Sequence, residues 1–104
     1  MLKHLKTLLM KQISNKPFIE NTIEESVVIR TFLVNTNPNE LHWHWDLEDR
    51  WVEPLEENDW QFQFDNELPI EINKQIHIPA GKIHRVIKGT TDLKIKIIKQ
   101  NGTR

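Results

Sequence analysis

The chain has 104 residues, enough for one domain with a single hydrophobic core and too few for two. It carries 14 Lys and Arg against 15 Asp and Glu, and the formal net charge of -1 argues against a nucleic-acid-binding surface, which needs a concentrated basic face. Cysteine is absent from the sequence, which excludes disulfides, thiolate metal sites and a cysteine nucleophile. Any metal site must therefore use nitrogen and oxygen ligands.

The N-terminal segment follows a helical pattern. Leu2, Leu5, Leu9 and Ile13 fall on one stripe of a helix, which could dock on the rest of the domain or on a partner subunit. Charged residues interrupt this segment, so it has no apolar stretch long enough for secretion or for spanning a membrane, and a cytoplasmic location is expected. We predict a helical or extended segment over residues 1–24 and a β domain over residues 25–104.

From residue 25 onward, short runs rich in Val, Ile, Phe and Trp alternate with Asn, Pro, Asp and Gly. Strands at such close intervals favour an all-β sandwich or barrel. The runs predict strands at residues 26–34, 41–45, 50–55, 60–65, 71–73, 75–78, 84–87 and 93–99.

Two of these runs alternate strictly between apolar and polar residues. The run at 60–65 places three aromatic residues on one face, and the run at 93–99 does the same with Leu93, Ile95 and Ile97. A domain this small needs every large apolar side chain in its core, so we assign both faces to the core.

A pair of histidines marks the predicted strand at 41–45. Because successive side chains of a strand alternate, His42 and His44 project to the same face, roughly 6.5 to 7 Å apart at their Cα atoms, while Trp43 points to the other face. Two imidazoles so placed can converge on one ion, although a His-x-His pair alone is a weak signal. Three carboxylates follow within five residues of His44: Asp46, Glu48 and Asp49.

A third histidine follows a turn later in the chain. The run at 76–78 predicts a strand in which His77 faces solvent, and Pro79 and Gly81 predict a tight turn after it. Proline presets φ and glycine accepts positive φ, so the turn leaves His84 little freedom at the start of the next strand.

The patterns His42-x-His44 and Pro79-x-Gly81-x-x-His84, in this order, resemble the two motifs of the cupin superfamily. The resemblance covers about residues 25–99 and is strongest between His42 and Lys88. It implies an all-β fold, a cupin-type antiparallel jelly-roll barrel, here with a short N-terminal helix. It also implies one divalent metal ion bound by His42, His44, His84 and a carboxylate, and pairing of two chains into a homodimer through the leucine stripe.

Three positions depart from the cupin motifs. Thr36 and Asn73 stand where the motifs have glycine, and Lys88 stands where the second motif ends in asparagine. The change at Asn73 is mild, because asparagine tolerates left-handed backbone.

The fourth ligand is open between three carboxylates. The resemblance favours Asp49, which sits at the commoner family spacing, with Glu48 as the alternative. Asp46 qualifies by strand parity only if the strand continues past His44 without a bend. A site of three histidines without a carboxylate also occurs within the family.

Imidazole and carboxylate ligands suit Fe, Zn, Ni or Mn, and an open coordination position would make the metal a Lewis acid or an oxygen-activating centre. Arg50, Gln63 and Arg85 are the candidate contacts to a substrate, and no catalytic residue is assigned.

The leading hypothesis is a metal-dependent enzyme of the dioxygenase, isomerase or lyase type that acts on a small polar or anionic metabolite. The main alternative is a module that binds a small ligand or a partner protein without turnover. In a third hypothesis the metal contributes only folding free energy. Neither nucleic acid nor a membrane is expected as a partner.

Overall fold

The computed structural model describes residues 16–100, and this part of the chain is all-β, as predicted. The predicted N-terminal helix and its leucine stripe lie outside the described residues. The elements are β1 (Phe18–Glu24), β2 (Val27–Phe32), the short 3-10 helix η1 (Pro38–Glu40), β3 (Arg50–Pro54), β4 (Gln61–Phe64), β5 (Ile70–Glu71), β6 (Ile76–Ile78), β7 (His84–Ile87) and β8 (Leu93–Lys99).

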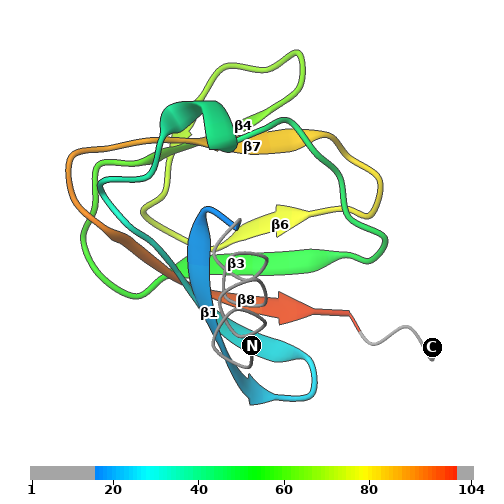
Figure 1. Ribbon diagram of the computed structural model, residues 1–104. Helices are drawn as coiled ribbons and strands as arrows, with labels where there is room; N and C mark the ends of the chain where they lie inside the picture. Colours follow the sequence, from blue (N-terminus) through cyan, green and yellow to red (C-terminus); the bar gives the residue numbers. More distant parts are fainter. Residues whose placement is uncertain (1–15, 101–104) are drawn as a thin grey trace, which may run out of the picture.

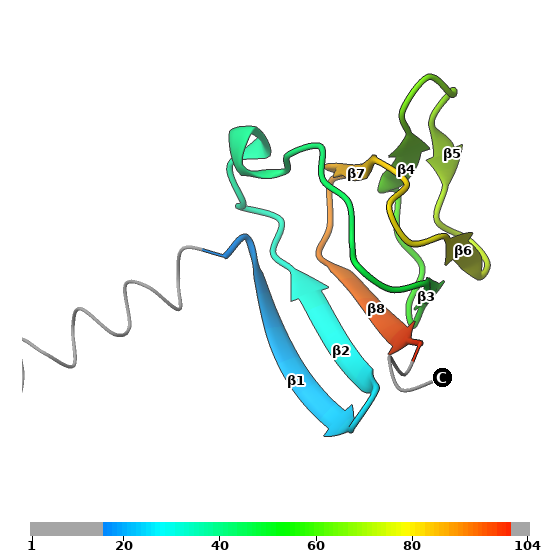
Figure 2. The same cartoon turned by 90° about the vertical axis from the view of Figure 1, so that its right-hand side faces the viewer.

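The strands form two antiparallel sheets that face each other (Figures 1 and 2). The larger sheet has the order β1-β2-β8-β3-β6, and the smaller has the order β5-β4-β7. Neighbours in a sheet are mostly far apart in the chain: β8 lies between β2 and β3, and β7 pairs with β4. The antiparallel architecture expected from the sequence is thereby confirmed.

The first strand lies before residue 25, within the segment predicted to be helical or extended. Its register places Phe18 opposite Phe32 and Glu20 opposite Arg30. The sequence pattern missed β1 because the strand lies at the edge of the sheet and leaves Ile19 and Ile23 exposed, so its apolar residues do not alternate with its polar ones.

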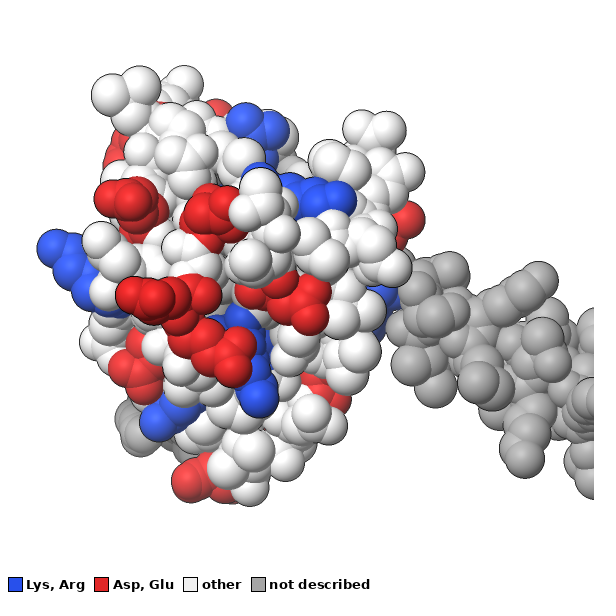
Figure 3. All heavy atoms as spheres, turned by 90° about the vertical axis from the view of Figure 1, so that its left-hand side faces the viewer, with Lys and Arg blue, Asp and Glu red and all other residues white. Residues whose placement is uncertain are grey.

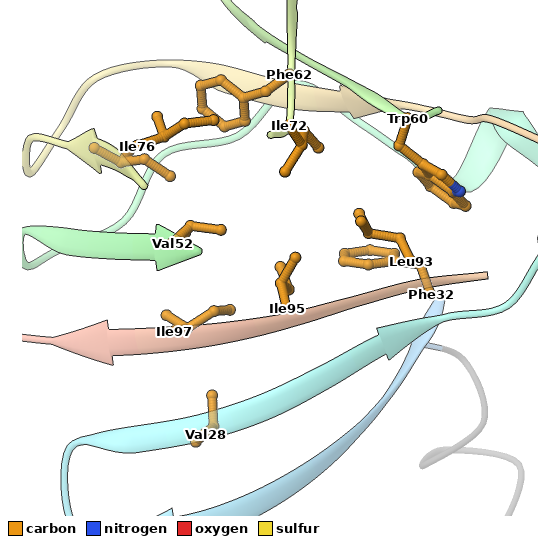
Figure 4. Close-up of a cluster of buried hydrophobic side chains, with 11 residues drawn as sticks. Val28, Phe32, Val52, Trp60, Phe62, Ile72, Ile76, Leu93, Ile95 and Ile97 are labelled. Atoms are coloured by element: carbon orange, nitrogen blue, oxygen red, sulfur yellow. The ribbon is translucent and has the colours of Figure 1, made fainter. Parts of the chain in front are cut away.

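The two predicted core faces pack against each other between the sheets. Figure 4 shows Trp60 and Phe62 on one side of the core and Leu93 on the other. Trp60 is 1% exposed and Leu93 is fully buried, and Ile95 and Ile97 are buried beside them. Alternating apolar residues thus determined which faces of β4 and β8 turn inward.

The surface carries both signs of charge. On the face drawn in Figure 3, acidic side chains gather near the centre, with basic side chains around them. No helix among residues 16–100 has the length and apolar character needed to cross a membrane.

Candidate metal centre

The site begins at a bridge between two distant parts of the backbone. His44 and His84 exchange both backbone hydrogen bonds, with N···O distances of 3.0 and 2.9 Å. Gly81, at a φ of 78°, donates its N–H to the carbonyl oxygen of Asp46 at 2.8 Å. Glycine adopts such a φ without strain, so the predicted turn at Gly81 is confirmed. Its hydrogen bond to Asp46 joins the segment that carries His84 to the segment that carries His44.

This bridge replaces a strand that we predicted. Residues 41–45 form no strand, and His44 takes part only in the isolated bridge to His84. The predicted strand at 41–45 is therefore wrong, and His42 does not join His44 in the group of possible metal ligands.

The two imidazoles are oriented by backbone carbonyls. Nδ1 of His44 lies 2.9 Å from the carbonyl oxygen of His42, and Nδ1 of His84 lies 2.8 Å from that of Lys82. A carbonyl oxygen can only accept, so each Nδ1 carries a proton, and Nε2 is the atom of each ring that is left for a metal ion. The ring centroids are 4.3 Å apart. This is the way in which outer hydrogen bonds prepare metal-binding histidines.

Asp46 supplies the third group. One carboxylate oxygen, Oδ2, is buried without a hydrogen-bond partner and lies 3.3 Å from Nε2 of His84, while Oδ1 lies 3.3 Å from Nη1 of Arg50. This contact is favourable when a positive charge lies between the two atoms, either a proton on Nε2 of His84 or a bound cation. Ligand atoms of His44, Asp46 and His84 all lie within 4.8 Å of one another, so these residues fit one bound ion.

Protonation states also fit a metal. Burial lowers the pKa of His44, and the neighbouring His84 adds to this effect, so the imidazole stays neutral. Burial would raise the pKa of Asp46, yet His84 and Arg50 hold it below its usual value, so the carboxylate stays charged. A neutral His44 imidazole and an ionised Asp46 carboxylate are the forms that bind a divalent ion.

The structure groups two of the four predicted ligands, His44 and His84, with Asp46 in place of the predicted Asp49. His42 lines the same cavity, but its exposed ring is not part of the group, and it contributes its carbonyl to His44 instead. The Asp49 carboxylate accepts from the Ala80 N–H at 2.8 Å and contacts Nε2 of His77 at 3.0 Å.

The alternative carboxylate is also engaged elsewhere. Glu48 accepts from Nε of Arg50 at 2.7 Å. Asp46, set aside because it required a straight strand, lies two residues after His44 and reaches the same side of the chain. The signal for it was therefore the two-residue spacing from His44, which puts both side chains on one side of an extended chain.

Of the three predicted substrate contacts, one lines the cavity and two lie outside it. Arg50 lines the cavity beside His44, Asp46 and His84, the three residues called the metal-binding group below because they could hold an ion. Gln63 and Arg85 do not line it: Arg85 donates from Nε to Gln63 at 2.9 Å, and its guanidinium lies 4.3 Å from the Trp43 ring. The inward residues of β4 and β7 are Phe62 and Val86, so both predicted contacts fall on the opposite face.

Arg30 is a cavity residue that the sequence analysis missed. It lies on β2 between Val28 and Phe32, both of which are buried. Alternation along the strand places all three side chains on the inner face, so this parity would have identified it.

A cavity of about 360 Å³ extends from the metal-binding group between the two sheets. Most of its lining is apolar, and Figure 4 shows Phe62 and Ile72 facing Val52 and Ile95 across this space. Enclosed apolar space with a few converging polar groups at one end is typical of a small-molecule site.

Asp49 is expected to stabilise the turn that positions His84. The N–H of Ala80 and the side chain of His77 lower the pKa of Asp49 from its ordinary value of 3.8. Its contribution is therefore complete above the unfolded-state pKa and is lost as the pH falls through the lower folded-state value. Asp49→Asn should lower Tm by a few degrees at neutral pH, and this difference from wild type should shrink below about pH 4.

Thermal unfolding of both proteins between pH 2.5 and 7 measures this difference. Asp65→Asn, a change at an exposed carboxylate in the β4–β5 hairpin, is the matched control and should show no such pattern. A deficit of Asp49→Asn that is the same at every pH would show that the ionised carboxylate does not hold the turn.

No protein-family model and no curated protein matches the sequence. Among solved structures, a cupin-2 domain containing protein from Shewanella frigidimarina NCIMB 400 is similar at a TM-score of 0.60 and 19% identity, over 89% of this chain and 92% of that one. FeII HppE is similar at 0.61 and 13%, over 80% of this chain and 50% of that one. A DMSP lyase structure is similar at 0.59 and 15%, over 73% of this chain and 38% of that one. This chain thus spans half or less of the last two proteins, and at these identities the likeness shows the fold: the protein has the cupin fold.

Proposed function

We propose that this protein is a small metal-binding cupin in which His44, Asp46 and His84 hold one divalent ion. One observation carries the proposal: the Oδ2 of Asp46 is buried without a hydrogen-bond partner, and ligand atoms of His44, Asp46 and His84 lie within 4.8 Å of one another. Arg50 contacts Oδ1 of this carboxylate, and a cation at Oδ2 would satisfy its second, buried oxygen, which is costly to leave without a partner.

Two histidines and one carboxylate, with coordination positions left for other molecules, are the ligand set typical of non-haem Fe(II) sites. Fe(II) is therefore the first choice, with Zn, Ni and Mn as alternatives. A bound ion would supply Lewis acidity or a binding position for dioxygen beside the cavity. The fold shared with FeII HppE and a DMSP lyase supports a metal-dependent enzyme acting on a small molecule, of the dioxygenase, isomerase or lyase type.

The test is a metal analysis of protein purified without chelator, followed by titration of the metal-free protein with Fe(II), Ni(II), Mn(II) and Zn(II) separately. We expect about one equivalent of metal per chain and a higher Tm in the presence of the ion, because a ligand that binds only the folded state stabilises it. A folded protein that contains no metal and binds none of the four ions would refute the proposal.

Binding without turnover is the second candidate function. The chain contains no tyrosine, and the titratable groups of the cavity apart from the metal-binding group and its arginines are Glu40 and His42, both exposed. Few groups are thus placed to move protons during a reaction. A ligand recovered unchanged after long incubation with metal-loaded protein would favour this function. The homodimer and the cytoplasmic location expected from the sequence stay predictions.

A further inference from the structure

The polar end of the cavity contains two arginines beside the metal-binding group. Arg30 has a side chain only 14% exposed, and its Nε and Nη2 donate to Oε1 of Glu20 at 2.8 and 2.7 Å. Its guanidinium also lies 3.8 Å from the centre of the Phe18 ring. These contacts fix the guanidinium and leave Nη1 without a partner among residues 16–100.

A bound divalent ion would bring the charges at this end of the cavity close to balance. Arg50 contacts Glu48 through Nε at 2.7 Å and Asp46 through Nη1 at 3.3 Å. Two arginines and a divalent ion carry four positive charges, against three negative charges on Glu20, Glu48 and Asp46. Glu40, which also lines the cavity, is exposed to solvent and supplies a fourth negative charge. The unpartnered Nη1 of Arg30 and the ion, and no net negative charge, are therefore what this end of the cavity offers to an anion.

The rest of the cavity excludes polar ligands. Its walls are built from core residues, among them Phe62, Ile72, Ile76 and Ile95, and they offer no side-chain hydrogen-bond partner. A polar substituent placed there would lose its bonds to water without replacement. At about 30 Å³ for each water-sized atom, the space accommodates roughly a dozen non-hydrogen atoms.

We propose that the ligand of this cavity is a small organic anion with an apolar body, such as a monocarboxylate with a medium-length hydrocarbon chain. The carboxylate binds between Arg30 and the metal-binding group, and the chain lies among Phe62, Ile72 and Ile95. This inference rests on the proposed function and deepens it, because it replaces the polar or anionic metabolite expected from the sequence with an anion that is largely apolar.

Octanoate is the probe, titrated calorimetrically into the Zn(II)-loaded and the metal-free full-length protein. Octanol, of the same shape without the charge, and gluconate, an anion with a polar body, are the comparison ligands. We expect octanoate to bind the loaded protein at least about tenfold more tightly than either, since a charge-assisted hydrogen bond and a matching apolar wall each contribute about this factor. Equal binding of octanoate and octanol would overturn the proposal.

Arg30→Gln should weaken octanoate binding about 10- to 100-fold. Arg85→Gln is the matched control, because its guanidinium lies outside the cavity, and it should leave binding unchanged. If Arg30→Gln does not fold, Ile72→Phe narrows the apolar end without changing a charge and should weaken octanoate in the same way. Wild-type affinity in these cavity variants would overturn the proposal.

Failure of this inference is distinguishable from failure of the proposed function. Metal binding without octanoate binding overturns the anion site and leaves the metal site standing. Octanoate binding that depends on Arg30 in a protein that takes up no metal supports the anion site and overturns the proposed function.

Discussion

Replacing His84 by alanine is expected to lower the affinity for the divalent ion by more than about 100-fold, because even loss of a residue that only orients a metal ligand costs 10- to 100-fold. His44→Ala and Asp46→Asn should have comparable effects, since all three side chains converge on one point. Titration of each metal-free variant with Zn(II) and Fe(II) measures the loss.

Two further variants separate this site from the one expected from the cupin motifs. His42→Ala should lose much less affinity than His84→Ala, because the His42 ring lies outside the group of three ligands and its contribution to His44 comes from the backbone. Asp65→Asn controls for a change of carboxylate to amide at an exposed position. Full metal affinity in Asp46→Asn, or equal losses in His42→Ala and His84→Ala, would contradict the site described here. Because His84 is buried, urea unfolding of the metal-free variants checks that they fold.

Removal of the Trp60 side chain is expected to destabilise the domain by about 3–5 kcal/mol, the usual cost of truncating a large buried aromatic residue. Trp60 packs against Phe32 at a ring separation of 5.6 Å, and its Nε1–H donates to the carbonyl oxygen of Thr91. Small domains have about 5–15 kcal/mol of total stability, so Trp60→Ala should leave little. The shift of the urea unfolding midpoint measures the change.

Trp45→Ala is the matched control, because Trp45 is 56% exposed and the same substitution there should change the free energy of unfolding by no more than about 0.5 kcal/mol. If Trp60→Ala does not fold, Trp60→Phe keeps most of the apolar volume and should show a smaller loss. Similar losses for Trp60→Ala and Trp45→Ala would contradict the packing seen in Figure 4.

Local chemistry made part of the site predictable. The turn at Pro79 and Gly81 depends on φ preferences that belong to these residue types, and the structure places Gly81 at positive φ just before His84. The identity of the carboxylate could not be predicted, because it depends on contacts between residues far apart in the chain. Asp46 lies beside the two histidines because Gly81 and His84 bond to the backbone at Asp46 and His44, whereas Asp49 bonds to Ala80 and His77.

By itself the sequence determined the all-β class and the inward faces of β4 and β8, because alternation acts within a few residues. The cupin resemblance implied that His44 and His84 lie close together. Only the tertiary structure decided that Asp46 completes the group and that Arg30 lines the cavity while Gln63 and Arg85 lie outside it. Those outcomes depend on how the two sheets pack, which brings together side chains from distant strands. The local sequence around each residue does not specify these long-range contacts.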